Sequence, residues 1–299
     1  MFVETVGFPS PAGVVLAADL YLPIGDSPPG GHPVVVVCLG WGSVKELMPQ
    51  WGAALTSMGY AALVPDYRGF GASGGERGRC FPEEHVADIR AAMGFVAERS
   101  ELDADRISLL GVSYGGAVAV AAGVDRRCRL VISVVGYGSG ERHLSAIRNA
   151  EQWREFRNRV AEDGRRRLEG APSETVDPDE ILLRDDEARA WRRRVERQYP
   201  HMAFRTTLES AEQILAFRPE RHLPYSPSKP AMFIHAGGDT MIPVDESRRM
   251  WRRAAEPKRF EVIAGIGHHE VHHGEGFEQV MDHVNDWLSQ HLAPDSDAG

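Results

Sequence analysis

The sequence has few cysteines, and the three present, Cys38, Cys80 and Cys128, lie far apart. So small and scattered a set excludes a disulfide framework, and an odd number is typical of a reduced, cytoplasmic protein. Long apolar runs are also missing: the longest, such as residues 33–39, have the length of a strand, so we expect no transmembrane helix and no membrane partner. The first residues contain no basic segment followed by an apolar one, which argues against a signal peptide.

The chain also lacks a surplus of basic residues. Lysine and arginine total 34, against 43 aspartates and glutamates, so the net charge is −9. An acidic balance does not favour nucleic acid as a partner, and we expect a small-molecule substrate instead. Hydrophobic residues make up 42% of the 299 positions, enough for a large core in one domain or in one domain with an insertion. The sequence leaves a homodimer open.

Strand-like and helix-like segments alternate along most of the chain. Strand-like runs lie at 32–40, 60–69, 106–113, 129–136, 229–239 and 259–265, and helix-like runs at 43–58, 82–100, 114–123, 245–255 and 276–291. Residues 13–23 alternate apolar and polar side chains and indicate the strands of an N-terminal hairpin. Strands that alternate with helices predict an α/β fold with a doubly wound, mostly parallel sheet.

The alternation stops between residues 141 and 226. This segment is dense in arginine and acidic residues, contains no strand-like run and has sparse apolar positions, which indicates amphipathic helices. Its arginines are balanced by acids, so solvated helix faces are favoured over an anion site. We therefore expect a core of residues 1–140 and 227–299, with 141–226 as a helical cap over the carboxyl ends of the strands.

A nucleophile motif follows the strand-like run 106–113. Gly111-Val112-Ser113-Tyr114-Gly115 fits G-x-S-x-G, which places a serine on a strained turn between a strand and a helix. The glycines leave clearance for that turn. The pentapeptide alone is a weak signal, but here a buried strand precedes it and a helix of very small residues follows. The alternative is a tight turn with a bystander serine.

A serine hydroxyl needs a base to activate it, and the base needs an orienting acid. Asp239 comes directly after one buried strand, and His268 comes directly after the next. Because the carboxyl ends of parallel strands share one edge of the sheet, both should lie near Ser113. Asp245 is a rival for the acid and His269 is a rival for the base.

The oxyanion formed during acyl transfer needs two backbone N–H donors. We expect one at Tyr114, where the helix after Ser113 begins. The other is expected at Trp41, in the glycine turn after the first central strand. The alternative is that Gly40 and Gly42 only shape a tight turn.

Residues 269–273, His-Glu-Val-His-His, also match H-E-x-x-H, the signature of zinc proteases. That interpretation requires an α-helix with His269 and His273 on one face and Glu270 as the base. Glycines on both sides of the motif leave room for barely two turns, and no third ligand stands at a recognised spacing. We therefore expect no metal and no other cofactor, with His272 and His273 as loop residues.

Several segments together resemble the α/β-hydrolase superfamily, above all its dienelactone-hydrolase-like and prolyl-oligopeptidase-like esterases and peptidases. These segments are AGVVLAADLYLP, GWGSVKE, DYRGFGASGG, DADRISLLGVSYGG, AGGDTMIP and GIGHHEVH, in family order, and they span nearly all the chain outside 141–226. The resemblance implies a triad of Ser113, Asp239 and His268, with oxyanion donors at Trp41 and Tyr114. One departure is Leu39-Gly40, where many members have His-Gly.

The expected activity is therefore hydrolysis of an acyl bond, most simply a carboxylic ester, through an acyl-enzyme on Ser113. Thioester, amide or C–C cleavage, and acyl transfer or cyclisation, would use the same residues, because the fold does not choose among them. A zinc peptidase and a non-catalytic binding protein are remote alternatives. Trp153 and Trp191 in the cap could line a pocket, but helix packing is favoured.

Overall fold

A computed structural model describes residues 1–25, 27–183, 186–225 and 229–292. One mixed sheet contains, in spatial order, β1 (Phe2–Pro9), β2 (Val15–Leu22), β4 (Ala61–Pro65), β3 (His32–Cys38), β5 (Leu102–Val112), β6 (Cys128–Val134), β9 (Ala231–Ala236) and β10 (Lys258–Ile263). The pairs β1–β2 and β2–β4 are antiparallel, and every other neighbouring pair is parallel. The prediction of a doubly wound, mostly parallel sheet is confirmed.

The N-terminal hairpin differs from the prediction in its position. Residues 13–23 supply only its second strand, β2, and the partner β1 comes earlier in the chain. Most residues of β1 are exposed, so it lacks the apolar run that would have revealed it. The pairing itself defines this strand, with Phe2 opposite Leu22 and Pro9 opposite Val15.

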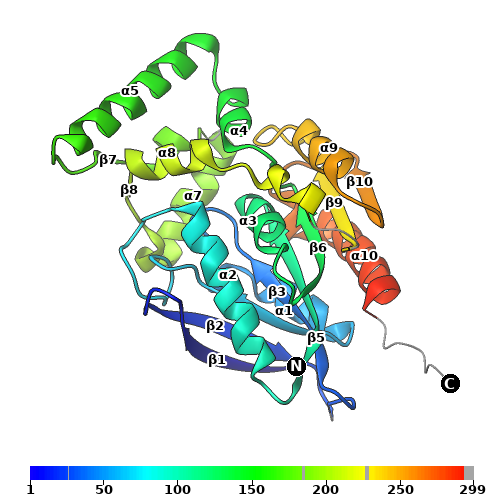
Figure 1. Ribbon diagram of the computed structural model, residues 1–299. Coiled ribbons are helices and arrows are strands. Elements are labelled where there is room, and N and C mark those ends of the chain that lie inside the picture. The colour runs from blue at the N-terminus through cyan, green and yellow to red at the C-terminus, as the bar shows by residue number, and fades with distance from the viewer. Residues whose placement is uncertain (26, 184–185, 226–228, 293–299) are drawn as a thin grey trace.

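Helices cover both faces of the sheet (Figure 1). On one face, α2 (Pro82–Ala97) and α3 (Tyr114–Ala122) pack against each other and on β5, with α9 (Val244–Arg253) over β9. On the other face lie α1 (Pro49–Ser57) and α10 (Gly274–His291), joined by the rings of Trp51 and Phe277, whose centroids are 5.0 Å apart. Since both faces are covered, a continuous apolar strand such as β3 is buried along its whole length.

Between β6 and β9 the chain leaves the sheet and forms an insertion, residues 140–225. Its helices are α4 (Gly140–Ala146), α5 (Ala150–Leu168), α6 (Pro178–Ile181), α7 (Asp186–Gln198) and α8 (Leu208–Ala216). Figure 1 shows α5 projecting away from the sheet. The expectation that this segment contains no strand was wrong: β7 (Thr175–Val176) and β8 (Thr206–Thr207) pair antiparallel. Two-residue strands are too short to leave a periodic signal in the sequence.

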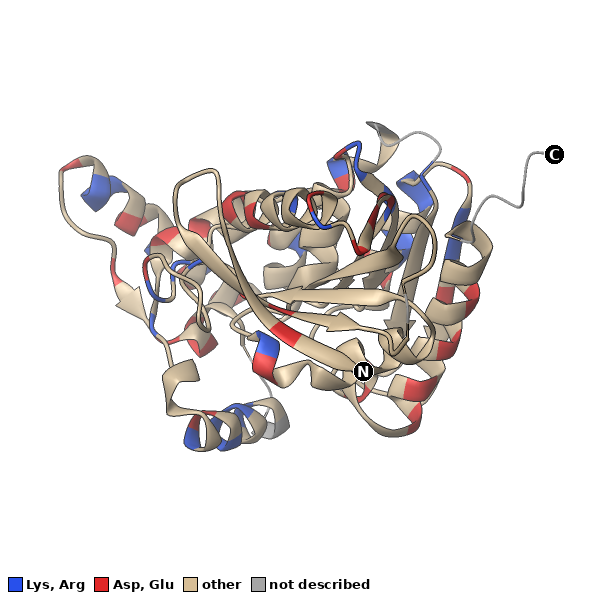
Figure 2. Ribbon diagram, turned by 90° about the horizontal axis from the view of Figure 1, so that it is seen from below, with Lys and Arg blue, Asp and Glu red and all other residues tan. Residues whose placement is uncertain are grey.

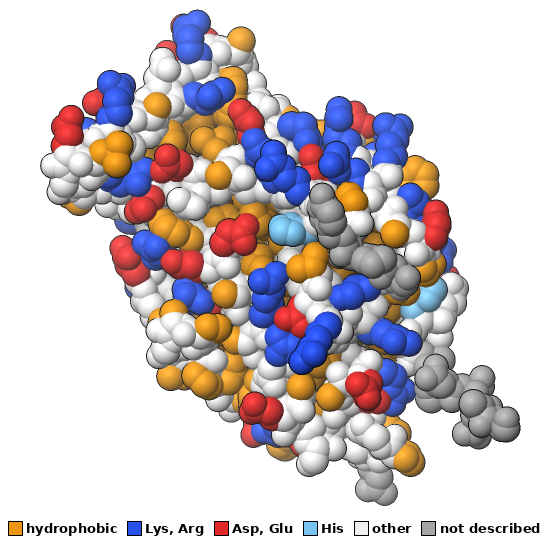
Figure 3. All heavy atoms as spheres, viewed as in Figure 1, with side chains coloured by type: hydrophobic (Ala, Val, Ile, Leu, Met, Phe, Trp, Pro, Cys, Tyr) orange, Lys and Arg blue, Asp and Glu red, His pale blue; other side chains and the backbone are white. Residues whose placement is uncertain are grey.

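The charged residues of the insertion largely neutralise one another. On α5, Arg167 pairs with Asp163 at 2.9 Å, and Arg159 pairs with Glu174 and Glu180 at 2.5 and 2.8 Å. Figure 3 shows the two signs interspersed where this helix projects. Figure 2 shows that charged residues lie mainly on the helices and loops and that the central strands carry few. No helix in the described part of the chain combines the length and apolar character that crossing a membrane would require.

Three histidine side chains are poorly solvated in the folded protein. Loss of solvation lowers the pKa to about 3 for His85, His143 and His272. His85 is 1% exposed, stacks on Tyr67 with centroids 4.4 Å apart, and lies 2.7 Å from the Tyr114 hydroxyl through its Nδ1. These side chains are therefore neutral in the folded protein near neutral pH.

This neutrality predicts acid sensitivity. Because the folded pKa lies below the ordinary 6.5, the unfolded chain binds more protons as the pH falls from 6.5 toward 3, so the free energy of unfolding decreases over that window. Each such histidine lowers the free energy of unfolding by about 2 kcal/mol as the pH falls from 6.5 to 5. Asp66, whose pKa burial raises to about 6, opposes the trend below pH 6, as does Asp88, whose pKa burial also raises. Burial also lowers the pKa values of His32, His235 and His291, which adds to the acid sensitivity.

Denaturant titrations from pH 7 to pH 5 should show the loss, and His85→Gln should make the pH dependence shallower. His201→Gln is the matched control, since this histidine is half exposed. The readout is the slope of the free energy of unfolding against pH, because His85→Gln also changes packing at every pH. Equal slopes for wild type and His85→Gln would contradict the prediction.

Candidate active site

Ser113 occupies a sharp turn at the carboxyl end of β5. Its backbone has φ 59° and ψ −124°, in the positive-φ region that non-glycine residues rarely adopt, and α3 begins at the next residue. A side chain at Gly111 would put its Cβ 2.0 Å from the carbonyl oxygen of Gly115, and one at Gly115 would lie 2.0 Å from that of Cys38. The glycines of the motif are therefore required by close backbone packing around the serine.

The structure brings Ser113, His268 and Asp239 into one hydrogen-bonded series. His268 Nε2 lies 3.0 Å from Ser113 Oγ, and His268 Nδ1 lies 2.6 Å from Asp239 Oδ2. Asp239 follows β9 and His268 follows β10, so neighbouring parallel strands deliver both side chains to the edge where β5 ends. This geometry allows His268 to take a proton from Ser113 while the carboxylate orients its ring.

Asp239 is held as a carboxylate. Burial acts to raise its pKa, but hydrogen bonding to His268 and the backbone N–H of Ile242 hold that pKa below its usual value. The N–H groups of Met241 and Ile242 both donate to Oδ1 at 2.8 Å. The rival Asp245 has a 63% exposed side chain that pairs with Arg248, so it takes no part in this series.

The turn after β3 lies against the serine. A Cβ on Gly40 would be 3.8 Å from Ser113 Cβ, and Trp41 lines a pocket together with Ser113 and Tyr114. Within the described ranges, the backbone N–H groups of Trp41 and Tyr114 donate to no protein acceptor. Both amides are therefore available to an oxygen bound beside Ser113.

Asp66 supports this turn and was not recognised from the sequence. Its carboxylate accepts the backbone N–H of Lys45 at 2.7 Å and that of Ala72 at 2.8 Å, which ties the segment after β3 to the loop after β4. Gly71 packs so closely that a Cβ there would lie 2.0 Å from the Asp66 carboxylate. The one available signal was an acidic residue at the end of a buried strand.

The HEVHH stretch adopts a different structure from that required for zinc. Residues 270–272 form a single 3-10 turn, and His273 is extended, so His269 and His273 do not share a helical face. Glu270 accepts the backbone N–H of Gly267 at 2.5 Å. Across the described ranges, no three histidine, cysteine or acidic side chains cluster as metal ligands do.

His272 lies in the connection between β10 and α10, where the sequence predicted a loop residue. The indole N–H of Trp51 donates to its Nδ1 at 3.1 Å. The histidine thus anchors the loop that carries His268 to α1. The sequence did not reveal this contact, because it joins segments that are far apart in the chain.

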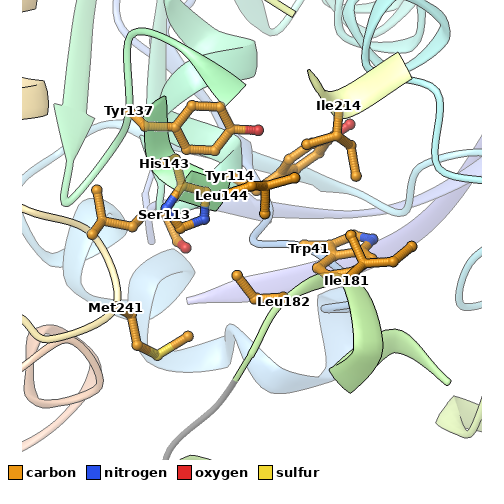
Figure 4. Close-up of a pocket in the computed structure, with 11 residues that line it drawn as sticks. Trp41, Ser113, Tyr114, Tyr137, His143, Leu144, Ile181, Leu182, Ile214 and Met241 are labelled. Carbon is orange, nitrogen blue, oxygen red and sulfur yellow. The ribbon is translucent and has the colours of Figure 1, made fainter. Parts of the chain in front are cut away.

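A mostly apolar pocket adjoins Ser113 (Figure 4). Its lining includes Leu144, Leu182 and Met241, and also the polar side chains Tyr137 and His143. Neither polar residue could be identified from the sequence, because both come from the junction of β6 with the insertion, where no motif marks them. A concave, mostly apolar pocket with a few polar groups is typical of small-molecule sites.

A second, more open hollow lies beside the same histidine loop. It is lined by Trp191, Arg194 and Arg197 of α7, with His269 and His273. The ring of Trp191 stacks on His269, with centroids 5.5 Å apart. The expectation of helix packing therefore fails for Trp191, which faces cavities near the site, whereas Trp153 packs beside Phe156.

Comparisons with known proteins identify the family. The family model described as serine aminopeptidase, S33, matches residues 31–275. A polyketide transferase of Aspergillus fumigatus is 29% identical over 97% of this chain and 98% of its own length. A thiohydrolase of Aspergillus aculeatus is 27% identical over 90% of this chain and 87% of its own length.

Solved structures share the fold at low sequence identity. DcsB, in complex with a substrate analogue, is 21% identical with a TM-score of 0.83, over 98% of this chain and all of that one. An esterase of Pyrococcus furiosus is 16% identical with a TM-score of 0.66, over 98% and 92% of the two chains. The resemblance to α/β-hydrolases is thus confirmed, and with the match over residues 31–275 the chain belongs to the serine aminopeptidase S33 family of α/β-hydrolases.

Proposed function

We propose that the protein is a serine hydrolase that cleaves a carboxylic ester through an acyl-enzyme on Ser113. The observation that carries this proposal is the series from Ser113 Oγ through His268 to Asp239, with distances of 3.0 and 2.6 Å. A strained serine, a base within hydrogen-bond reach and a buried orienting carboxylate are the requirements for nucleophilic acyl transfer.

In the proposed mechanism, Ser113 Oγ attacks the acyl carbonyl as its proton passes to His268 Nε2. The negative charge that develops on the carbonyl oxygen is stabilised by the N–H groups of Trp41 and Tyr114. His268 then donates the proton to the leaving group, which departs and leaves the acyl group on Ser113. Water, deprotonated by the same ring, releases the acid and restores the serine. Asp239 holds the imidazole tautomer throughout.

We also propose that residues 141–226 act as a cap that selects substrates, with residues 1–140 and 227–299 as the catalytic core. The pocket beside Ser113 supports this division, because Leu144 and Ile181 of the insertion line it together with core residues. Chemistry would then depend on the core, and substrate range on the insertion.

A thioester is the second candidate substrate, and the hollow beneath α7 supports it. Arg194 and Arg197 line this hollow, and among the described residues neither pairs with a carboxylate. Two arginines without a carboxylate partner in the described part of the chain, in a hollow that His269 also lines, favour an anionic leaving group, such as the phosphate-bearing thiol of a coenzyme A thioester. The likeness to a thiohydrolase is consistent with this alternative.

Replacing the nucleophile should abolish turnover. Ser113→Ala should lower kcat for a p-nitrophenyl ester by at least about 10³-fold, because the serine and histidine act as a unit. Ser108→Ala is the matched control: it removes, from the same strand, a buried hydroxyl that has no hydrogen-bond partner among the described residues, so activity should persist. A fluorophosphonate probe should label Ser113. Labelling of another residue, or an active Ser113→Ala protein, would refute the assignment.

The histidine loop distinguishes the serine and zinc mechanisms. His268→Ala should abolish ester hydrolysis, whereas His269→Ala, Glu270→Gln and His273→Ala should each retain substantial activity, since none of them carries the proton. Chelators should have no effect on the rate, and metal analysis should find no stoichiometric zinc. Stoichiometric zinc together with an inactive Glu270→Gln protein would establish the metallopeptidase mechanism instead.

Charge reversal beneath α7 tests the thioester alternative. The double variant Arg194→Glu/Arg197→Glu should lower kcat/KM for an acyl-coenzyme A by about tenfold or more, because like charges then meet the phosphates. The neutral N-acetylcysteamine thioester of the same acyl group should be much less affected. Arg154→Glu, on the exposed face of α5, is the control. Equal losses for both thioesters would argue against a phosphate-bearing leaving group.

A further inference from the structure

Two polar side chains in the pocket beside Ser113 have hydrogen-bonding atoms without protein partners. His143 is 4% exposed and Tyr137 is 2% exposed. Within the described part of the chain, His143 Nδ1 and the Tyr137 hydroxyl make no hydrogen bond. Leaving a buried polar atom unpaired is unfavourable, so native proteins satisfy nearly all of them. The indole nitrogen of Trp41, which lines the same pocket, likewise makes no hydrogen bond among the described residues, so three such atoms border the pocket and a bound group can complete them.

The two side chains form one unit within the pocket. Their rings stack with centroids 4.9 Å apart and an interplanar angle of 19°, and both line the pocket with Ser113 (Figure 4). Most of the remaining lining is aliphatic, as at Leu182 and Ile214. A bound group would therefore meet a few polar atoms on a largely apolar wall.

The segment that carries these residues is held in a strained, fixed conformation. Val135, directly after β6, has φ 44°, which is a marked outlier for a β-branched residue. The next turn is fixed by Glu246 of α9, which accepts the backbone N–H groups of Gly138 and Ser139 at 2.9 and 3.1 Å. Strain of this kind persists only where the surroundings impose it, and it concentrates at binding and catalytic sites.

The protonation states of His143 and Tyr137 are suited to binding an uncharged oxygen group. Loss of solvation lowers the pKa of His143 to about 3, so the ring is neutral and has one N–H donor and one acceptor nitrogen. Burial also raises the pKa of Tyr137 well above its usual value, so its hydroxyl stays protonated and can donate or accept. A carboxylate or ammonium group would find no compensating charge on either ring.

We propose that His143 and Tyr137 bind an oxygen substituent on the acyl group, so that the preferred substrate is an apolar acyl chain with a hydroxyl or oxo group close to its carbonyl. This inference rests on the proposed acyl hydrolase function. Proximity to the carbonyl follows because both rings line the same pocket as Ser113, where the carbonyl must lie. An unsubstituted chain would leave both polar atoms unpaired, and such sites reject analogues that lack the matching group.

The test compares acyl groups of equal length on one leaving group. N-acetylcysteamine thioesters and p-nitrophenyl esters of octanoate, 3-hydroxyoctanoate, 3-oxooctanoate and 5-hydroxyoctanoate would be assayed with the full-length protein. At least one oxygenated chain should exceed octanoate in kcat/KM by about tenfold or more, the effect of one or two recovered hydrogen bonds. Comparison of the hydroxyoctanoates with 3-oxooctanoate identifies which oxygen group the site prefers.

Variants then assign that preference to the two side chains. Tyr137→Phe removes only the hydroxyl and His143→Phe keeps a ring to stack, so each should bring the ratio of oxygenated to plain substrate toward one. Tyr21→Phe is the matched control, because Tyr21 is a buried tyrosine on β2 away from the pocket. The ratio of oxygenated to plain substrate for Tyr21→Phe should match that of the wild type. Fluorophosphonate labelling of Ser113 reports whether each variant retains a formed site.

The outcomes separate this inference from the function on which it rests. Ser113-dependent turnover without preference for any oxygenated chain would overturn the role of His143 and Tyr137 and leave the hydrolase proposal standing. A preference that survives Tyr137→Phe would also overturn it, even if His143→Phe failed to fold. Absence of Ser113-dependent turnover on every ester and thioester would refute the proposed function itself.

Discussion

The candidate site depends on the close approach of three backbone segments around Ser113. The end of β3, the end of β5 and the start of α3 meet so tightly that a single added methyl group at Gly111 or Gly115 would lie 2.0 Å from a carbonyl oxygen. Ser113 therefore cannot relax from its φ of 59° without separating the strands from the helix. The same packing holds the turn after β3, which carries Trp41, against the serine and the start of α3. Positioning of this kind, rather than any unusual side chain, is what acyl transfer requires.

Electrostatics around the serine follow from how each ionisable group is solvated. Asp239 is buried, yet hydrogen bonding holds its pKa low, so it remains a carboxylate beside His268. His143 has no such partner, and loss of solvation keeps it neutral. Two histidines in one site thus have different surroundings: one is oriented toward the serine by a carboxylate, and the other lines the pocket beside Ser113 as a neutral ring. Burial alone does not determine a residue's role; the partner that it finds does.

The parts of this structure that local sequence patterns determine could be predicted, and those that depend on distant contacts could not. Apolar runs identified the parallel strands and the intervening helices, and the glycine-flanked serine identified the elbow, because each signal lies within about ten residues. The grouping of Ser113, Asp239 and His268 followed from one topological rule, that parallel strands end at a common edge. Asp66, Tyr137 and the partner of His272 were missed, since each matters through a contact with a remote segment. The strands β7 and β8 were missed because two residues have no periodicity.

The cluster of Arg142, Glu220 and Glu246 has a mechanical consequence for the insertion. Arg142 on α4 binds Glu220, near the far end of the insertion, at 2.6 Å and Glu246, on core helix α9, at 2.7 Å. These ion pairs of Arg142 thus join both ends of the insertion to each other and to the core at one place. A movement of the insertion that preserves these ion pairs would hinge beyond Arg142, toward α5 and α7. His143, the next residue along the chain, would stay with the core during such a movement, so its wall of the pocket would keep its shape while the opposite wall moves.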